Sequence, residues 1–190
     1  FLRCPMTEEQ PDLLTRFREG DPSAFSSLVA EMGPRLKGFF LRLGAQASTA
    51  EDLTQHVFLR VYQSSDRYQA SGRLPAYLLR IARNLWIDYC RKKRPFSLGE
   101  SFPDAADSGP GPVELGEAGD RAALLRKALA SMDLATQEII EMAVLQQLPY
   151  QDVAAVLHIP VGTVKSRVYY ALRKLREGLE HPLRDSTPES

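Results

Sequence analysis

The sequence predicts an all-α protein made of two small helical domains joined by a flexible acidic linker. Apolar residues recur at three- and four-residue intervals in both halves, which is the spacing of one helix face, and no segment alternates like a half-buried strand. Residues 95–119 are rich in Pro, Gly, Ser and acidic residues, and such a composition cannot bury enough apolar surface to fold. The predicted domains are therefore residues 6–94 and 120–180.

The first helix of the first domain has a strong start signal. Asp21 is a suitable N-cap, and Pro22 follows at the first helical position, where its missing N–H costs nothing. Gly33 and Pro34 are expected to kink or break this helix. Its expected apolar side comprises Phe25, Leu28, Val29, Met32, Leu36, Phe39, Phe40 and Leu43.

Two further helices complete the predicted first domain. Ser48 and Glu51 have the spacing of a capping box, so we expect a helix over residues 49–63. After a polar loop, Pro75 opens a long helix to residue 94. The expected buried residues are Ala50, Leu53, Val57 and Val61 in the former, and Leu78, Ile81, Ala82, Leu85 and Tyr89 in the latter.

The second domain ends in a predicted helix-turn-helix. Helical apolar spacing covers residues 121–132 and 134–148, and the segment "PYQDVAAVL" follows. A short turn, "HIP", leads into a last helix, "VGTVKSRVYYALRKLRE". One side of that last helix is apolar: Val164, Val168, Ala171, Leu172 and Leu175.

Composition excludes several classes of protein. The chain is 44% hydrophobic and 25% charged, as expected of a globular protein, and no apolar run approaches the roughly 20 residues that span a bilayer. We therefore expect no membrane insertion. No secretory signal pattern is present, and Cys4 and Cys90 are too few for a disulfide framework, so a reducing cytoplasm is expected.

Charge is distributed unevenly along a chain that is neutral in total, with 24 basic and 24 acidic residues. Residues 21–94 hold twelve basic and six acidic residues. Residues 95–120 hold six acidic residues and neither Lys nor Arg. A basic first domain next to an acidic linker is compatible with a nucleic-acid partner.

The sequence offers no catalytic site. The three histidines are scattered without metal-ligand spacing, and there is neither a Gly-rich phosphate loop nor a nucleophile elbow. We therefore expect no enzyme, no metal, no cofactor and no small-molecule substrate.

The last helix carries a polar, basic side opposite its apolar side. Ser166, Tyr170 and Arg173 lie at its centre, and the flanking residues are Lys165, Arg167, Lys174 and Arg176. An α-helix fits the major groove, where Arg and Lys read guanine edges. An ordinary solvated basic face is the alternative, but its position after a short turn, with Ala154 allowing close helix approach, favours DNA recognition.

A second basic stripe follows the predicted helix 75–94. Its members are Arg80, Arg83, Ile87, Arg91 and Arg94, with Asn84 beside them. Arginines can hold phosphates, and an asparagine can bond a base edge. Tyr68 and Tyr77 flank the preceding loop, where an unstacked base could lie between rings, although core packing of either tyrosine is an equal alternative.

The third surface lies on helix 49–63, opposite its buried side. It is polar, mildly acidic and without supporting bases, so neither phosphate binding nor catalysis explains it. A protein-docking surface is one interpretation, and ordinary solvated helix is the other. Its members are Asp52, Gln55, His56, Leu59 and Gln63.

The order of these segments resembles the extracytoplasmic-function (ECF) group of bacterial sigma factors. "AEDLTQHVFLRVY" is similar to region 2.2, "YLLRIARNLWIDYCRKKR" to regions 2.3–2.4, and "VLHIPVGTVKSRVYYALRKLRE" to region 4.2. The resemblance extends from about Asp21 to Glu177. It implies a transcription initiation subunit that joins core RNA polymerase and recognises promoter DNA.

The resemblance also implies residue roles. The core polymerase would be bound by Asp52, Gln55, His56 and Leu59. The melted minus-ten strand would be captured by Tyr68, Tyr77, Arg80, Arg83, Asn84 and Arg91 within and after the loop 64–74. The minus-thirty-five duplex would be read by Thr163, Lys165, Ser166, Arg167, Tyr170 and Arg173. The linker would thread toward the polymerase cleft, and an anti-sigma factor is an expected partner.

The chain departs from the family pattern at several positions. His56 replaces a usual Glu, which is expected to weaken the core contact or make it depend on pH. Leu74 replaces a frequent Phe and Tyr77 a frequent Trp in the base-capture region. His158 replaces a Gly in the turn, where a left-handed backbone costs His more than Gly. Tyr170 stands where relatives often carry Arg, and this bears on the minus-thirty-five sequence.

Two other functions are compatible with parts of the sequence. A stand-alone helix-turn-helix repressor or activator would need duplex affinity of its own, normally through dimerisation. No dimer helix is evident, and the face on 49–63 would stay unexplained. An adaptor that binds an anti-sigma factor or core without initiating would not need both DNA-binding surfaces.

Overall fold

A computed structural model describes residues 11–70, 73–93, 128–129 and 131–180. All elements in these ranges are helical and none is a strand, which confirms the predicted fold class. The elements of the first half are α1 (Leu13–Arg18), α2 (Pro22–Arg42), α3 (Ala47–Gln63), the 3-10 turn η1 (Ser65–Arg67) and α4 (Leu74–Lys93). The second half contains α6 (Leu134–Ile140), the π-helical turn η2 (Glu141–Leu145), α7 (Tyr150–Leu157) and α8 (Val161–Glu180).

The start of α2 is as predicted, whereas the helix does not break at Gly33 and Pro34, one of the two outcomes expected there. The Asp21 side chain caps the helix by accepting a hydrogen bond from the Ser23 backbone N–H at 3.0 Å. The helix continues through Pro34 to Arg42 as one element. Proline removes one helical hydrogen bond, but Met32 and Leu36, on either side of it, are both buried in the core and hold the two halves of the helix in place.

The predicted capping box of α3 is wrong. The helix begins at Ala47, and its N-cap is the extended residue Gln46, which makes no side-chain capping bond. Ser48 therefore lies within the first turn rather than before it. The Glu51 carboxylate instead pairs with Lys37 on α2, so its partner comes from a neighbouring helix.

Helix α1 was not predicted from the sequence. Its six residues are too few to show a helical period, but Asp12 caps it by accepting from the Thr15 N–H at 2.9 Å. Leu14 is fully buried, and the Phe17 ring lies 5.0 Å from that of Phe25 on α2. Tertiary contact, rather than length, therefore stabilises this helix.

The helix-turn-helix is confirmed. His158 ends α7 in the left-handed conformation, with φ 55° and ψ 43°, as expected from a position where glycine is usual. A second left-handed residue, Gln147 with φ 56°, was not anticipated. It follows η2, where the predicted helix 134–148 changes to π-helical hydrogen bonding and ends.

The apolar side of α8 is largely as predicted. Val164, Val168, Ala171 and Leu175 are buried, while Leu172 is 43% exposed and its expected burial is wrong. The predicted helix 121–132 lies mostly outside the described residues, and the linker 95–119 lies wholly outside them.

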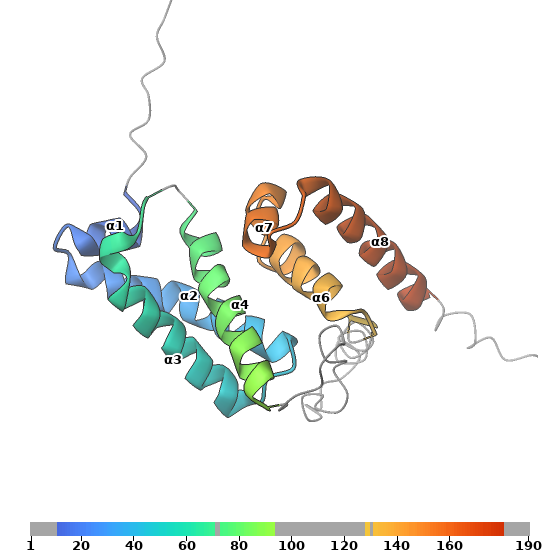
Figure 1. The fold of residues 1–190 in the computed structure, drawn as a ribbon, viewed down its shortest axis with the longest axis horizontal. Coiled ribbons are helices and arrows are strands. Elements are labelled where there is room, and N and C mark those ends of the chain that lie inside the picture. Colours follow the sequence, from blue (N-terminus) through green and yellow to red (C-terminus); the bar gives the residue numbers. More distant parts are fainter. Residues whose placement is uncertain (1–10, 71–72, 94–127, 130, 181–190) are drawn as a thin grey trace, which may run out of the picture.

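The two helical halves pack against each other (Figure 1). Helix α4 contacts α7, and buried apolar residues from both halves form one continuous cluster. Leu79 and Val153 are fully buried members of that cluster. Within the described ranges, no helix combines the length and hydropathy needed to cross a membrane.

Candidate nucleic-acid interface

Helix α8 presents the predicted basic face to solvent. Lys165, Ser166 and Arg167 are exposed, while Val164 and Val168 anchor the helix in the core. The apolar spacing thus orients the helix, because burial of one side leaves the opposite side free. The exposed side of α8 therefore has the size and the polar side chains needed to enter a DNA major groove.

Tyr170 and Arg173 form a connected pair further along the same face. The Arg173 guanidinium lies 5.5 Å from the centre of the Tyr170 ring, and its Nε lies 3.4 Å from Oε1 of Glu177. Tyr169 packs its ring edge-on at 5.5 Å from that of Tyr170. Both tyrosine rings are largely exposed, so this part of the helix offers aromatic as well as cationic contacts.

Helix α4 carries its predicted polar residues in two different environments. Arg80, Asn84 and Arg91 are exposed. The Arg83 side chain, however, is only 16% exposed, because it is covered by the second half of the chain. The structure therefore leaves three members of the predicted minus-ten surface accessible and covers a fourth.

A cavity of about 340 Å³ opens where α4 meets α7. The Arg80 guanidinium lies 5.7 Å from the centre of the Tyr77 ring, and the Tyr68 and Tyr77 rings lie 4.9 Å apart. The other lining residues are Arg67, Gln69, Arg73, Ala76, Asp152, Ala155 and Val156. Cationic and aromatic groups from the first half thus face an acidic residue of the second.

Tyr68 belongs to the core rather than to the open surface. It is 5% exposed, and its hydroxyl donates a 2.7 Å hydrogen bond to the Asp12 carboxylate. Arg18 donates to its carbonyl at 2.7 Å. Burial and the bond to Asp12 raise the pKa of the Tyr68 hydroxyl above its usual value. The core-packing alternative therefore describes Tyr68 in this conformation.

The predicted docking face of α3 is open to solvent. Asp52, Gln55, His56 and Leu59 are all exposed, opposite the buried side of the helix. Leu59 is an exposed large apolar residue among polar neighbours, an arrangement that suits a protein partner. The residues predicted to bind core polymerase thus share one exposed face of α3.

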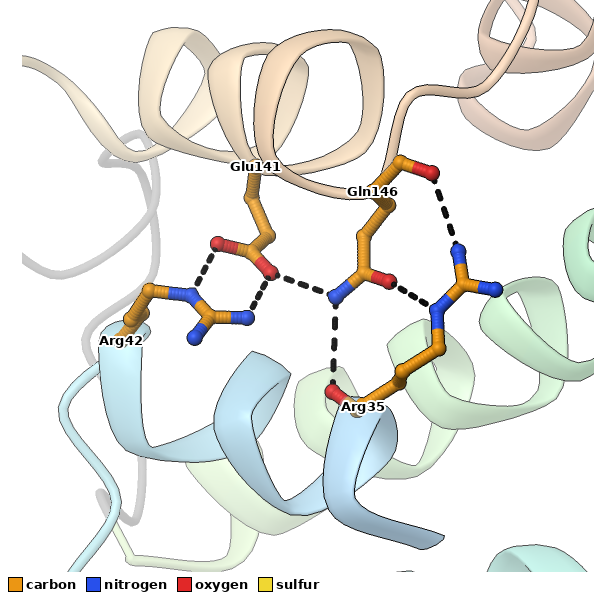
Figure 2. A network of polar contacts seen from close by, with 4 residues as sticks. All are labelled: Arg35, Arg42, Glu141 and Gln146. Carbon is orange, nitrogen blue, oxygen red and sulfur yellow. Dashed lines mark hydrogen bonds and ion pairs between the residues drawn. The ribbon is translucent and has the colours of Figure 1, made fainter. Parts of the chain in front are cut away.

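A polar network joins the two halves at α2 and η2 (Figure 2). The Arg42 guanidinium donates two parallel hydrogen bonds of 2.6 Å to the Glu141 carboxylate. Gln146 donates to the same carboxylate at 2.9 Å and accepts from Arg35 Nε at 3.0 Å, while Arg35 also donates to the Gln146 carbonyl at 3.0 Å. We call these four residues the interdomain clasp.

Two more ion pairs cross the same boundary. Arg83 Nε lies 3.1 Å from Oε2 of Glu138, and Arg73 Nε lies 3.2 Å from Oδ1 of Asp152. Both carboxylates are buried. Burial raises the pKa of Glu138, and the attraction and hydrogen bond of Arg83 oppose that rise.

This acidic interface was not predicted from the sequence. Glu138 and Glu141 are three residues apart on consecutive helical turns, so they share one face, and Asp152 follows on α7. The available signal was the presence of charged residues inside apolar helical segments. Without the tertiary fold nothing related those carboxylates to arginines that lie between 55 residues earlier, as in the pair of Arg83 and Glu138, and 99 residues earlier, as in the pair of Arg42 and Glu141.

Metal binding finds no support in the parts of the chain that the structure covers. No group of three or more His, Cys, Asp and Glu side chains there is arranged to hold an ion. The charged residues described above are instead engaged in ion pairs or face solvent.

Two family models match the chain. Residues 28–96 match Sigma-70 region 2, and residues 122–175 match Sigma-70, region 4. The first match covers the helices that carry the docking face and the α4 arginines, and the second includes the helix-turn-helix.

Curated relatives agree with these matches. The chain is 34% identical over 158 residues to the ECF RNA polymerase sigma factor RpoE of Cereibacter sphaeroides, covering 83% of this chain and 87% of the relative. It is 30% identical over 164 residues to the RNA polymerase sigma factor CarQ of Myxococcus xanthus, covering 86% and 94%.

Solved structures share the fold. A sigma factor RpoE in complex with the anti-sigma factor NepR from Bartonella quintana aligns with a TM-score of 0.62 at 26% identity, covering 82% of this chain and 96% of that one. CnrH in complex with the cytosolic domain of CnrY aligns with a TM-score of 0.64 at 22% identity, covering 92% and 97%.

A helix-turn-helix half with a basic face and an arginine-bearing half with an exposed polar face on α3, matching Sigma-70 regions 4 and 2, together define a two-module transcription initiation factor that directs RNA polymerase to promoters. The chain belongs to the ECF group of RNA polymerase sigma factors. The resemblance seen in the sequence is thereby confirmed, and the alternative of a stand-alone helix-turn-helix regulator is not favoured.

Proposed function

We propose that this chain acts as a non-catalytic specificity subunit whose two domains, residues 6–94 and 120–180, hold separate promoter elements while the first domain holds core polymerase. The observation that carries the proposal is the coexistence of an exposed docking face on α3 with a basic, solvent-facing α8. A stand-alone regulator would need only the second of these surfaces.

Core polymerase is assigned to the face formed by Asp52, Gln55, His56 and Leu59. Support comes from the exposure of all four residues and from their position in the family match. His56 replaces a usual carboxylate, so the chain presents less negative charge to core than the family pattern. We expect this contact to be weaker than in relatives that retain Glu.

The melted minus-ten strand is assigned to the loop 64–74 and α4. Arg80, Asn84 and Arg91 are accessible, and Tyr77 lies beneath Arg80 at the cavity. Arginine and an aromatic ring together suit a single strand, since one neutralises phosphate and the other stacks on bases. Tyr68 supports this site from the core, and Arg83, which pairs with Glu138 in this structure, is assigned to the same site.

The minus-thirty-five duplex is assigned to α8. Thr163, Lys165, Ser166 and Arg167 lie on the first two turns, which is the part of a recognition helix that enters the major groove. Tyr170 and Arg173 extend the contact along the helix. Tyr170 in place of a frequent Arg favours a base step that accepts an aromatic or apolar contact, such as a thymine methyl.

The acidic linker 95–119 is assigned to the basic nucleic-acid channel of the polymerase, which its charge complements. An anti-sigma factor is a proposed partner, supported by the likeness to the RpoE structure described with NepR. We place the protein in the cytoplasm, where the transcription machinery works, and expect no metal, cofactor or small-molecule substrate.

The test is run-off transcription on genomic DNA fragments of the encoding organism, with core RNA polymerase and the purified full-length chain, followed by sequencing of transcript 5′ ends. One mapped fragment is then used in gel shifts with the chain alone and with core, at fixed salt because salt controls DNA affinity. We expect specific binding and transcription only when core is present.

A matched pair of variants sharpens the test. The Asp52→Ala, Gln55→Ala double variant should lose transcription by losing core, whereas Glu31→Ala, an exposed acidic residue on α2, should not. Tight specific binding of the fragment by the chain without core would contradict the proposal and support a stand-alone regulator.

A further inference from the structure

We propose that helix α1 braces the loop that captures the minus-ten strand, and that Asp12 and Arg18 are positioning residues for promoter recognition. The braced segment is residues 64–70, which we call the capture loop. This role rests on the proposed function, in which the loop holds the melted strand. It goes further in giving a function to a helix that precedes the residues matched by Sigma-70 region 2 and carries none of the residues assigned to DNA or core.

Tyr68 of the capture loop is held at both its side chain and its backbone. Its hydroxyl donates to Oδ2 of Asp12 at 2.7 Å, and its carbonyl accepts from Nη1 of Arg18 at 2.7 Å. These bonds join positions that are 56 and 50 residues apart in the sequence. A side-chain bond alone leaves the backbone free to rotate, and a backbone bond alone leaves the ring free. Together they fix the residue, and we call the three residues the loop brace.

Asp12 serves the helix and the loop at the same time. Its Oδ1 caps α1 by accepting from the Thr15 N–H and from the Thr15 hydroxyl, each at 2.9 Å, which leaves Oδ2 for Tyr68. Hydrogen bonds to a carboxylate or from a guanidinium are roughly twice as strong as those between neutral groups. The formation of α1 therefore fixes a strong acceptor in the position that the loop needs.

Helix α1 is itself anchored to elements outside the loop. It lies where the start of α2 meets the end of α3 (Figure 1). Leu14 is fully buried, and the Phe17 ring lies 5.0 Å from that of Phe25 on α2 and 5.6 Å from that of Tyr62 on α3. A brace needs a support that does not move with the part it holds, and these core contacts provide one.

The loop brace is continuous with residues that would meet the DNA strand. The Tyr68 ring lies 4.9 Å from that of Tyr77, over which the Arg80 guanidinium lies at 5.7 Å. Arg67 and Gln69, on either side of Tyr68, are exposed and line the cavity beside α4. A shift of Tyr68 would therefore displace both of its neighbours and its ring partner.

A braced loop has an advantage in binding and in selectivity. Ordering a flexible loop at the moment of binding opposes binding, because each ordered residue loses conformational entropy. A loop that is ordered in the free protein avoids this loss, and groups held in place distinguish a correct base from an incorrect one. The brace should therefore act on selectivity for the minus-ten sequence and not on the minus-thirty-five contact.

Two variants of the full-length chain each remove one bond of the brace. Arg18→Met keeps an unbranched side chain and removes the donor to the Tyr68 carbonyl. Asp12→Ser keeps a suitable N-cap but lacks the second oxygen that accepts from Tyr68. Arg16→Met is the matched control, because Arg16 lies on the same helix and pairs with Asp21, outside the loop. Circular dichroism verifies that all variants keep their helical content.

Hydrogen exchange in the free chain measures the brace itself. Two backbone amides of the capture loop donate to carbonyls of the same turn at 3.0 Å, so their exchange reports local opening. We expect peptides covering residues 64–70 to exchange roughly tenfold faster in both brace variants, since each loses a charge-assisted hydrogen bond that favours the ordered loop. The control variant should exchange like wild type.

Competition between two templates measures the role of the brace in recognition. Core polymerase and each variant are given a mapped promoter and a copy with a substituted minus-ten element in one mixture. The ratio of the two transcripts does not depend on the fraction of folded protein, so a general loss of stability leaves it unchanged. We expect this ratio to fall roughly fivefold in both brace variants and to stay at the wild-type value in the control.

A second pair of templates, which differ only in the minus-thirty-five element, should give the wild-type ratio in every variant. The double variant Asp12→Ser, Tyr68→Phe tests whether Asp12 acts through Tyr68. Both substitutions remove the same bond, so the double variant should be no more impaired than the more affected single variant. Additive losses would overturn the role of Asp12.

Each remaining outcome decides between the brace and its role. Unchanged exchange of the capture loop in both brace variants would overturn the brace. Faster exchange with an unchanged minus-ten ratio, or an equal fall in both template ratios, would overturn its role in recognition. A wild-type chain that does not transcribe with core would reject the proposed function and with it that role, whereas exchange in the free chain would still decide whether α1 orders the loop.

Discussion

Arg83 on α4 and Glu138 on α6 form an ion pair with 3.1 Å between Nε and Oε2, across the boundary between the two domains. The arginine is 16% exposed and the carboxylate 4%. The other carboxylate oxygen, Oε1, has no hydrogen-bond partner among the described residues. One buried charge is therefore only partly compensated, and the contact is correspondingly sensitive to the protonation state of Glu138.

Glu138→Gln should make the free energy of unfolding depend less on pH. Burial raises the folded-state pKa of Glu138 above its ordinary 4.5, despite the opposing effect of Arg83. Its stabilising contribution is then full below that ordinary value and is lost as pH rises through the raised pKa. Urea unfolding of wild type and variant between about pH 4 and pH 8 measures the difference.

We expect Glu138→Gln to be at least as stable as wild type at neutral pH. Above the ordinary glutamate pKa, its free energy of unfolding should change less with pH than that of wild type. Glu31→Gln, an exposed acid on α2, serves as the control and should follow the wild-type curve. Parallel curves for wild type and Glu138→Gln would contradict the assignment.

Lys165→Ala and Arg167→Ala should each weaken use of a promoter by roughly 1–3 kcal/mol per lost base contact. Both side chains are exposed at the start of α8, where a recognition helix meets base edges. The measurement is transcription with core from templates with matched and scrambled upstream elements. Lys37→Ala, a basic residue remote from α8, controls for a general loss of charge.

For a residue that reads bases, the defect should appear on the matched template and shrink on the scrambled one. Equal transcription by wild type from both templates would defeat the assignment of α8 to the minus-thirty-five element. An equal loss on both templates in a variant would mark that side chain as a phosphate contact.

His158→Gly should stabilise the helix-turn-helix by about 0.5–1 kcal/mol, because a left-handed backbone costs a residue with a Cβ more than it costs glycine. The φ of 55° at this position places it in that region. Gln147→Gly, at φ 56°, should give a similar gain. Thermal unfolding of both variants and their combination measures the effects.

His158→Ala separates the backbone effect from loss of the imidazole. Alanine keeps a Cβ, so it should not reproduce the gain of glycine. Equal stabilisation by His158→Ala and His158→Gly would show that loss of the imidazole, and not the backbone conformation, causes the gain in stability.

His56→Glu should tighten binding to core polymerase by restoring the carboxylate that the family pattern has at this exposed position of α3. One additional exposed opposite-charge contact contributes roughly 0.2–1 kcal/mol. Competition against the wild-type chain for limiting core, at low and at raised salt, measures the gain. His56→Gln, which adds no charge, should not reproduce it, and a gain that persists unchanged at high salt would argue against a charge effect.

Tyr68→Phe should destabilise the first domain by roughly 1–2 kcal/mol, since it removes the hydroxyl donor to Asp12 and leaves that carboxylate without this partner. Because the folded-state pKa of Tyr68 is raised, its contribution in wild type is full below the ordinary value of 10 and falls as pH rises beyond it. Urea unfolding should therefore show that wild type loses free energy of unfolding between neutral and alkaline pH, and that Tyr68→Phe does not show this loss. Tyr169→Phe, an exposed tyrosine, is the control.

Much of the helical architecture was predictable because its signals are local. Asp21 and Pro22 mark the N-terminus of α2. The apolar spacing of Val164, Val168 and Leu175 determines which side of α8 is buried. The apolar spacing also predicted which side chains of α3 and, apart from Leu172, of α8 face solvent. These properties depend on residues within a few turns of one another.

Signals that compete with tertiary packing were less reliable. Pro34 does not interrupt α2, because core contacts on both sides of it stabilise the helix. The six residues of α1 are too few to show a helical hydrophobic period, and it is the packing of Leu14 in the core that stabilises them as a helix. Leu172 lies on the apolar side predicted for α8 yet is exposed, because apolar spacing by itself does not show which residues of that side a neighbouring helix covers.

The sequence by itself determined the class of the protein: all-α, with a helix-turn-helix, a basic arginine helix and an exposed polar face on α3. Only the tertiary structure decided that Arg83 is covered, that Tyr68 is a core residue, and that Glu138, Glu141 and Asp152 hold the two domains together. The physical reason is distance along the chain. Periodicity and capping act over a few residues, whereas an ion pair such as that of Arg42 with Glu141 joins positions that only the packing of whole domains brings within 2.6 Å.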